Sequence, residues 1–370
     1  MFYHLIYPLR EYISGLNIFR YITFRTALAI FFSFVISLAF GPFLIRVLRN
    51  KTNTITRKLT PESHKKKSGT PSMGGILILA AIIISTLLTG NLKNQNVLLC
   101  IITLIGFGLL GFLDDYIKDF FSKGKGISSR FKFFTQIVLA TIIAVYLFYF
   151  NPNEYLLGKN TPAVLAVTSI YIPFLNNVSV NIGLFYIPFA VFLIVGFSNA
   201  VNITDGLDGL AIGLTLFTVL AFTTIAYLSG HRQIAEYLKI PFSPQVGEIT
   251  VFTGAIAGAC LGFLWFNSHP AQIFMGDTGS LSLGGIIAVI ALLLKNEIIF
   301  GVIGGVFVIE TASVILQVLS FRLRGKRIFK MAPIHHHFEI LGYPENKIIL
   351  RMWIVGAVCA LTGIASLKIW

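Results

Sequence analysis

The six aspartates of this chain fall into three short clusters, each beside a long apolar segment. A carboxylate next to hydrocarbon costs about 3 kcal/mol on insertion scales, so such residues tend to be functional. Three clusters that meet at one membrane surface would suit a divalent cation, because magnesium takes one or two carboxylates together with substrate phosphates. The clusters are Asp114, Asp115 and Asp119 in GFLDDYIKDF, Asp205 and Asp208 in NAVNITDGLDGL, and Asp277 in IFMGDTGS.

The Asp114-Asp115 pair ends one apolar segment and is followed by several basic residues. Adjacent carboxylates repel each other, so both stay ionised only near a cation or near bases. The alternative is a solvated helix end. The presence of the other two clusters favours a site. Asp119 is interpreted as structural, because it faces a run of lysines.

In NAVNITDGLDGL, Asn202, Asp205 and Asp208 recur at intervals of three on one side of a turn that opens an apolar segment. The free N–H groups of a helix N-terminus suit a phosphate or a uracil carbonyl. Helix capping by Thr204 or Asp205 is the alternative, and both roles are compatible. Asp277 also opens a helix, either as a cap or as a magnesium ligand.

The composition indicates a membrane protein. Apolar residues make up 55% of the chain, charged residues 12%, and the mean hydropathy is +0.81. The three cysteines lie in apolar runs without paired spacing, which argues against disulfides and against a zinc site. The first 25 residues, with Arg10, Arg20 and Arg25, are interpreted as an interfacial segment.

The predicted fold is an all-α polytopic membrane protein in one domain, 1–370. A bilayer-crossing helix needs about 20 apolar residues, and that criterion gives about ten transmembrane helices. The predicted spans are 26–48, 74–90, 97–115, 132–150, 185–201, 207–229, 249–266, 281–295, 298–321 and 348–369.

The basic residues predict the orientation of these spans. An even number of spans places both termini on one side, and one set of loops holds 20 of the 29 Lys and Arg. The positive-inside rule assigns that set to the cytoplasm, so both termini are expected on the outer side of the membrane. All six aspartates then face the cytoplasm. The active site is expected in the loops 49–73, 114–132, 202–207, 267–280 and 322–347.

Two outer segments are interpreted as structural. β-prone runs on both sides of Asn176-Asn177 predict a small hairpin. Residues 231–240 predict a short amphipathic helix on the outer surface.

Two basic loops and one acid inside a span complete the candidates. Three consecutive histidines, His335 to His337, cannot all face one metal ion from a regular helix, so we expect hydrogen bonds to phosphate or sugar oxygens, or a structural role. Lys65 and Thr70 lie in a loop that could reach an anionic substrate, or could serve only topology or anionic lipid. Glu310, inside the ninth span, either pairs with a neighbouring helix or marks a break.

Six strings occur in order between residues 65 and 340 and together resemble the polyprenyl-phosphate N-acetylhexosamine-1-phosphate transferases. They are SGTPSMGG, GFLDDYIK, SNAVNITDGLDGLAIG, FNSHPAQIFMGDTGSLSLGG, FVIETASVILQV and APIHHHFE. The triple-histidine string separates one branch from relatives that act on UDP-N-acetylglucosamine. The resemblance to that branch implies UDP-N-acetylmuramoyl-pentapeptide and undecaprenyl phosphate as substrates, lipid I and UMP as products, and a requirement for Mg²⁺.

The resemblance also implies roles for individual residues. Asp277 is assigned to Mg²⁺ with Asp115 close by, and Asp114 to the proton or position of the lipid phosphate. The broken ninth span is expected to offer a groove for the polyprenyl chain. The predicted catalytic residues are Asp114, Asp115, Asp277 and His336. The predicted substrate-binding residues are Lys65, Thr70, Lys132, Asn199, Asn202, Asp205, Asp208, Asn267, Phe274, Gln317, His335 and His337.

Two alternatives stay open at this point. A sister transferase would use a different UDP-sugar. An ion-coupled transporter would place its acids near the bilayer midplane rather than at the ends of spans. We expect the lipid bilayer and no nucleic acid among the partners, and a homodimer is the assembly considered. Whether an aspartate forms a covalent intermediate is left open.

Overall fold

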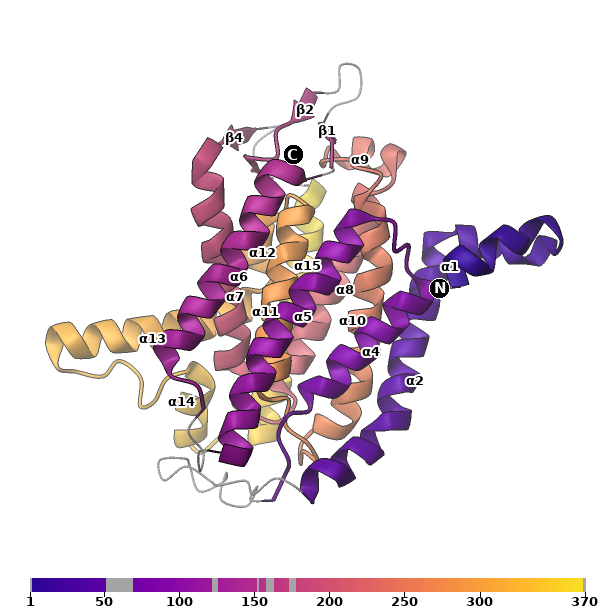
Figure 1. The fold of residues 1–370 in the computed structure, drawn as a ribbon. Helices are drawn as coiled ribbons and strands as arrows, with labels where there is room; N and C mark the ends of the chain where they lie inside the picture. The colour runs from indigo at the N-terminus through magenta and orange to yellow at the C-terminus, as the bar shows by residue number, and fades with distance from the viewer. Residues whose placement is uncertain are drawn as a thin grey trace.

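The computed structural model describes residues 2–50, 69–121, 126–151, 153–157, 163–172 and 178–368. It is a bundle of long helices with small strands gathered at one end (Figure 1). Lys65 lies outside the described residues. The prediction of an all-α polytopic membrane protein is confirmed.

Nine helices of the described part are long and apolar enough to cross a membrane, and α4 is a shorter apolar helix. A helix therefore covers each predicted span except the ninth, 298–321, which is divided between two helices. The ten helices are α2 (Ile22–Arg49), α4 (Gly75–Thr89), α5 (Gln95–Tyr116), α6 (Ser129–Phe150), α7 (Tyr186–Thr204), α8 (Leu210–Ser229), α10 (Ile249–Asn267), α11 (Gly276–Leu293), α13 (Gly305–Arg324) and α15 (Glu345–Ala365). The shorter ones are α1 (Phe2–Leu5), α9 (Arg232–Leu238), α12 (Glu297–Ile303) and α14 (Ile334–Ile340).

The centre of the bundle is formed by α10 and α11, whose apolar stretches are 83% and 89% buried. Glycines let neighbouring helices approach the first turn of α11 closely. A Cβ on Gly111 of α5 would lie 2.2 Å from the carbonyl oxygen of Asp277, and one on Gly75 of α4 would lie 2.1 Å from the nitrogen of Gly279. The ends of α4 and α5 are thereby held against the N-terminus of α11.

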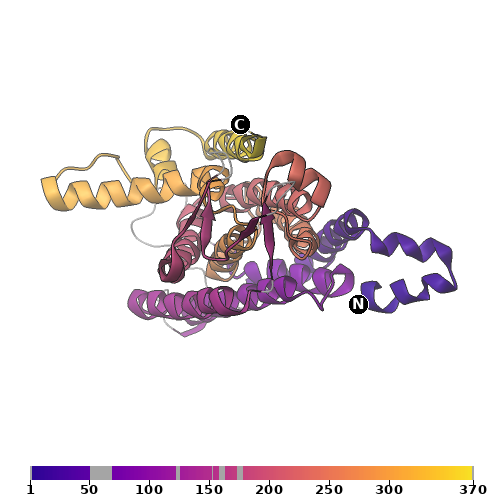
Figure 2. The same cartoon turned by 90° about the horizontal axis from the view of Figure 1, so that it is seen from above.

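The predicted ninth span is not continuous. α12 ends at Ile303, and after Gly304 the chain continues as α13, which leaves the bundle sideways (Figures 1 and 2). Gly304 packs against the ring of Phe197, where a Cβ would come within 2.9 Å. The break therefore lies at Gly304 and not at Glu310.

The strands form two small antiparallel sheets. β3 (Ser169–Tyr171) pairs with β4 (Ser179–Asn181), which confirms strands on both sides of Asn176-Asn177. The pair of β1 (Tyr155–Leu157) and β2 (Ala163–Leu165) was not predicted. The short helix expected within 231–240 is present as α9.

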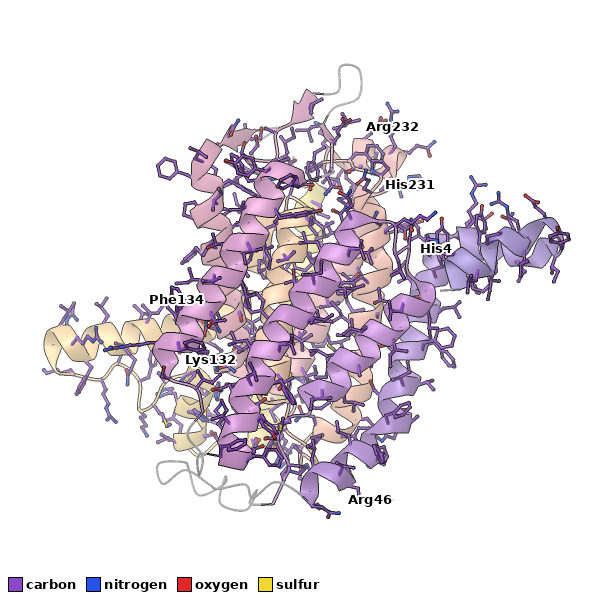
Figure 3. All side chains as sticks on the ribbon, viewed as in Figure 1. His4, Arg46, Lys132, Phe134, His231 and Arg232 are labelled. Carbon is purple, nitrogen blue, oxygen red and sulfur yellow. The ribbon has the colours of Figure 1, made fainter. Side chains whose placement is uncertain are left out.

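The two ends of the bundle differ in their residues. We call the end with the strands the strand end; it also carries His231 and Arg232 (Figure 3). Arg46 lies at the opposite end, and Lys132 lies towards it (Figure 3). We call this opposite end, which holds the aspartates, the acid end.

The first residues of the chain project away from the bundle at the start of α2 (Figures 1 and 2). They include α1 and two 3-10 helices, Tyr7–Glu11 and Ser14–Arg20. Their anchor is Arg25, whose guanidinium donates two hydrogen bonds of 2.7 Å to Glu248. The guanidinium also lies 4.3 Å from the centre of the Tyr3 ring.

Candidate active site

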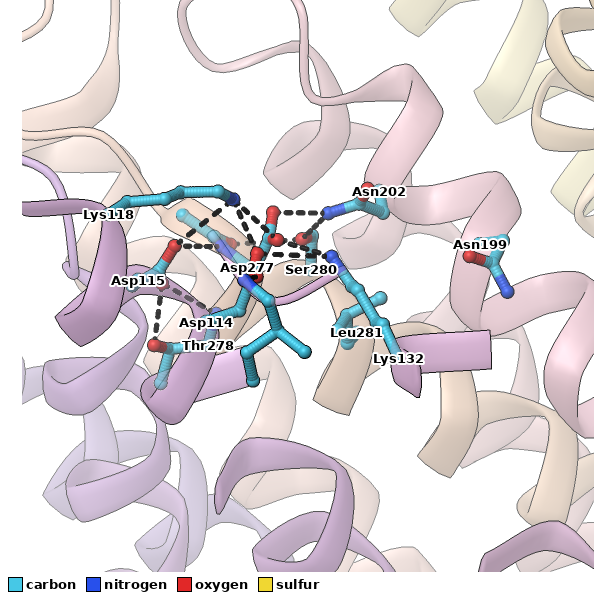
Figure 4. Close-up of polar contacts among 12 residues, drawn as sticks. Asp114, Asp115, Lys118, Lys132, Asn199, Asn202, Asp277, Thr278, Ser280 and Leu281 are labelled. Carbon is cyan, nitrogen blue, oxygen red and sulfur yellow. Dashed lines mark hydrogen bonds and ion pairs between the residues drawn. The ribbon is translucent and has the colours of Figure 1, made fainter. Parts of the chain in front are cut away.

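Three aspartates from two helices meet at the acid end. Asp114 and Asp115 come from the last turns of α5, and Asp277 comes from the first turn of α11. One carboxylate oxygen from each lies within 4.8 Å of the others. We call these three residues the acid cluster (Figure 4).

Asp115 is turned towards the N-terminus of α11. Its two oxygens accept hydrogen bonds from the backbone N–H groups of Asp277, at 3.1 Å, and Thr278, at 2.9 Å. The hydroxyl of Thr278 also donates to it at 2.7 Å. The first N–H groups of a helix lack partners inside the helix, so Asp115 caps α11 from a neighbouring helix.

Two lysines bridge the other two carboxylates. The ammonium nitrogen of Lys118 lies 2.5 Å from Asp114 Oδ2 and 2.8 Å from Asp277 Oδ2. Lys132 lies 3.4 Å from Asp114 Oδ2 and also donates to Asp277 Oδ2. Asp114 Oδ1 accepts the N–H of Ile127 at 2.7 Å.

Lys118 was not among the predicted site residues. A lysine four residues after an aspartate on a helix is a neighbour of that aspartate, and this spacing was the available signal. It was obscured by the other basic residues in the same segment.

Asn202 joins the acid cluster from the end of α7. Its amide nitrogen donates to Asp277 Oδ1 and to the hydroxyl of Ser280, each at 2.8 Å (Figure 4). The structure therefore places Asn202, one of the predicted substrate-binding residues, beside the acid cluster.

The cluster suits a divalent cation. Three carboxylates carry a formal charge of −3, and the ammonium groups of Lys118 and Lys132 stand between Asp114 and Asp277 where positive charge is needed. An all-oxygen donor set of this kind favours magnesium, calcium or manganese over softer metals.

The turn between α7 and α8 forms a second group. Asp208 is buried, and its Oδ2 lies 3.1 Å from His269 Nδ1 and accepts the N–H of Ala271 at 3.1 Å. The N–H of Asp208 donates to Glu345 at 3.0 Å. These contacts fix the end of the turn.

Asp205 occupies the same turn and is partly buried. Burial raises its pKa to about 8, and the negative charges of Asp277, Asp115 and Asp208 act in the same direction. The carboxyl group of Asp205 is therefore mostly protonated at pH 7.

Asn267 braces the turn from α10. Its side-chain oxygen accepts the N–H of Gly209 at 3.1 Å, and its amide nitrogen donates to the carbonyl of Ile273 at 2.8 Å. Both ends of this buried amide are bonded to backbone. Asn267 therefore positions the residues around it.

The loop that contains Thr70 is bonded to the segment before α11. The backbone of Phe274 donates to Pro71 at 2.8 Å and accepts from Gly74 at 2.9 Å. The hydroxyl of Thr70 lies 3.5 Å from the carbonyl of Ala271. Phe274 itself is partly buried.

Asp119 fastens the same loop from the other side. It accepts a hydrogen bond of 2.5 Å from the hydroxyl of Ser72. It lies in the short π-helix Ile117–Phe121 that extends α5. This contact fits the structural role expected for Asp119, and the role consists in holding the loop before α4.

The three histidines have three separate environments. His335 is fully buried, with Nδ1 3.1 Å from Glu310. His336 Nδ1 lies 2.5 Å from Glu339, and His337 Nδ1 accepts the N–H of Lys330 at 3.1 Å. His335 therefore does not offer a free surface to a substrate.

Gln317 and Asn199 are also engaged. Gln317 accepts the N–H groups of Ile328 and Phe329, each at 3.0 Å, and so binds the loop that follows α13. Asn199 donates to the side-chain oxygen of Gln136 at 2.7 Å. Among the described residues, neither side chain bonds to the acid cluster.

An apolar cavity of about 920 Å³ lies between α6, α7 and α13. Several of its lining side chains are exposed at the side of the bundle, so the cavity opens there. Asn199 and Thr311 are among its few polar residues. Its apolar lining includes Phe133, Phe192, Val308 and Ile315.

The fold and the acid cluster define a class of membrane enzyme, and comparison with known proteins gives the same class. Residues 96–295 match Glycosyl transferase family 4. Residues 67–79, which include the loop of Thr70, match the first signature of the phospho-N-acetylmuramoyl-pentapeptide-transferases.

Relatives extend over the whole chain. A phospho-N-acetylmuramoyl-pentapeptide-transferase of Thermodesulfovibrio yellowstonii is 48% identical, and one of Brachyspira hyodysenteriae is 47% identical, each over 100% of both chains. One of Citrifermentans bemidjiense is 46% identical over 100% of this chain and 99% of its own. This chain belongs to the phospho-N-acetylmuramoyl-pentapeptide-transferase family.

Proposed function

We propose that this protein transfers phospho-N-acetylmuramoyl-pentapeptide from UDP-N-acetylmuramoyl-pentapeptide to undecaprenyl phosphate. The products are lipid I and UMP, and the reaction is the first membrane step of peptidoglycan synthesis. The observation that carries the proposal is the acid cluster with its two lysines, in a chain whose full-length relatives bear the name of this activity.

The bond that forms joins an oxygen of the lipid phosphate to the β-phosphorus of the nucleotide sugar. The bond that breaks joins this phosphorus to the oxygen of the departing UMP. Two anions must approach each other, so neutralisation of charge and in-line positioning are the main tasks of the site. Lys118 and Lys132 can provide both, because their ammonium groups on flexible stems already meet at Asp277.

We assign the acids separate tasks. Asp277 and Asp114 face the two lysines, whereas Asp115 holds the first turn of α11. Mg²⁺ held by Asp277, with Asp114 and Asp115 beside it, would neutralise phosphate charge and act as a Lewis acid. Asp114 orients the lipid phosphate and accepts its proton when it has one. Asn202 fixes the Asp277 carboxylate through Oδ1.

The apolar cavity supports a place for the polyprenyl chain. Its walls come from α6, α7 and α13, and Asn199 lies in its wall. The turn with Asp205 and Asp208 and the loop of Thr70 are assigned to the nucleotide, His336 and His337 to the sugar-peptide. We further propose that the acid end faces the cytoplasm from the inner membrane, as the basic loops predict.

The test is release of UMP by the purified protein with undecaprenyl phosphate and Mg²⁺, using each UDP-sugar in turn. We expect release with UDP-N-acetylmuramoyl-pentapeptide together with a lipid product of matching mass. Asp277→Asn should abolish it, and Glu154→Gln, an exposed carboxylate near the strands, should not. Release only with another UDP-sugar would replace our substrate, and no release with any would refute transfer.

A further inference from the structure

Glu310 and His335 form a fully buried pair that the reaction scheme above does not use. Glu310 lies on α13, His335 on α14, and both are 0% exposed. Glu310 Oε2 lies 3.1 Å from His335 Nδ1. Burying two titratable groups is costly unless they are paired, so this contact fixes the position of the histidine ring.

The other edge of the ring touches the turn between α7 and α8. A Cβ on Gly206 would lie only 2.3 Å from His335 Nε2. Nε2 is buried and has no hydrogen-bond partner in the part of the chain that the structure describes. A ring nitrogen covered by backbone in this way cannot reach a substrate, so its contact with Gly206 is one of packing.

Gly206 stands between the two acids of that turn, Asp205 and Asp208. Its N–H donates to the carbonyl of Thr204 at 2.8 Å. A displacement of Gly206 by the histidine ring would therefore also displace the backbone of the turn. The far end of the turn is fixed independently by Asn267 and Glu345. His335 therefore packs against the middle of the turn, at Gly206.

We propose that Glu310 and His335 are positioning residues for the nucleotide substrate. This proposal rests on the function proposed above. The pair fixes the backbone position of the turn at Gly206, and this position determines the affinity for the uridine nucleotide. It takes no part in phosphoryl transfer. Glu310 belongs to α13, and Val308 and Thr311, close to it in the sequence, line the apolar cavity.

The experiment varies the two substrates separately and measures UMP release by the full-length protein in detergent. We expect Glu310→Ala and His335→Ala to raise KM for the nucleotide about tenfold or more. We expect kcat to stay within about threefold and KM for undecaprenyl phosphate to stay unchanged. Glu310→Gln keeps a hydrogen-bonding oxygen and should stay within about threefold of the wild type.

A double substitution tests the contact itself. Gly206→Ala alone should raise KM for the nucleotide, because its Cβ collides with the ring. His335→Ala makes room for that Cβ, so the double variant should be no worse than His335→Ala alone. His231→Ala, at the strand end, is the matched control, and thermal unfolding of every variant reports folding.

Three results would overturn the proposal. A fall in kcat at constant KM would make His335 part of the chemistry. If the increases in KM caused by Gly206→Ala and His335→Ala multiply in the double variant, the two residues do not act through their contact. An unchanged KM for the nucleotide in a folded His335→Ala variant would show that His335 does not position the turn. If Glu310→Ala does not fold, the Gly206–His335 cycle decides alone, and an inactive wild type would instead refute the proposed function.

Discussion

Replacing Lys118 by methionine tests the charge arrangement of the site most directly. Its ammonium nitrogen lies 2.5, 2.8 and 4.0 Å from oxygens of Asp114, Asp277 and Asp115. Methionine keeps the apolar stem and removes the charge. The formal charge of the acid cluster with its two lysines then changes from −1 to −2.

The geometry sets the expected magnitude. At an effective dielectric constant of about 20, a charge pair at about 3 Å interacts by about 5 kcal/mol before desolvation. Net values for a hydrogen bond between charged groups are about 1.5–3 kcal/mol, and the side chain is partly exposed, so we take about 2.5 kcal/mol. Loss of that much transition-state stabilisation lowers kcat/KM about 70-fold.

The same substitution should have the opposite effect on the metal ion. Lys118 competes with a cation for the carboxylates, so its removal should lower the Mg²⁺ concentration for half-maximal activity. A change of about 1.4 kcal/mol corresponds to about tenfold.

The assay is UMP release as a function of Mg²⁺ for the wild type, Lys118→Met and the matched control Lys93→Met. Lys93 lies between α4 and α5, at the opposite end of α5 from Asp114 and Asp115. Slower turnover with tighter Mg²⁺ activation supports the assignment. Normal turnover, or a weaker response to Mg²⁺, would show that Lys118 neither neutralises phosphate nor competes with the ion.

Three further outcomes are expected. Asp277→Asn should reduce UMP release at least 100-fold while thermal unfolding still shows a folded protein; substantial activity would exclude Asp277 from the site. Because the pKa of Asp205 is raised to about 8, the folded state holds an extra proton between about pH 4 and 8. The free energy of unfolding should therefore fall as pH rises through that window, and Asp205→Asn should flatten this slope in melts at pH 5 to 9. Equal slopes for both proteins would contradict the raised pKa. Arg25→Met should destabilise the protein by about 3 kcal/mol with unchanged turnover, because it leaves Glu248 unpaired; replacing both residues by apolar ones should restore much of the loss.

The spans were predictable because apolar runs of about 20 residues leave a chain few alternatives in a bilayer. The position of the break in the ninth span was left open, because Glu310 could either pair with a neighbouring helix or mark the break; the structure shows Glu310 paired with His335. Glycine is common in membrane helices, and hydropathy does not change at Gly304. The close approach of Gly304 to Phe197 at the break is a tertiary contact, which the sequence pattern does not reveal.

The composition of the site was also predictable, but its internal contacts were not. The sequence indicated that Asp114, Asp115 and Asp277 belong together, whereas the capping role of Asp115 depends on how closely Gly111 lets α5 approach α11. The burial of His335 could not be predicted either. Three consecutive histidines have the same pattern whichever ring points inward.

The sideways departure of α13 has a kinetic consequence. The apolar cavity that it lines is bordered by exposed side chains of Phe192 and Ile315, so it opens along the flank of the bundle. A polyprenyl ligand would then enter by two-dimensional diffusion within one leaflet. The quantity that governs turnover would be the mole fraction of carrier lipid in the membrane. Adding inert phospholipid to the same vesicle suspension would slow the enzyme without changing the bulk concentration of either substrate.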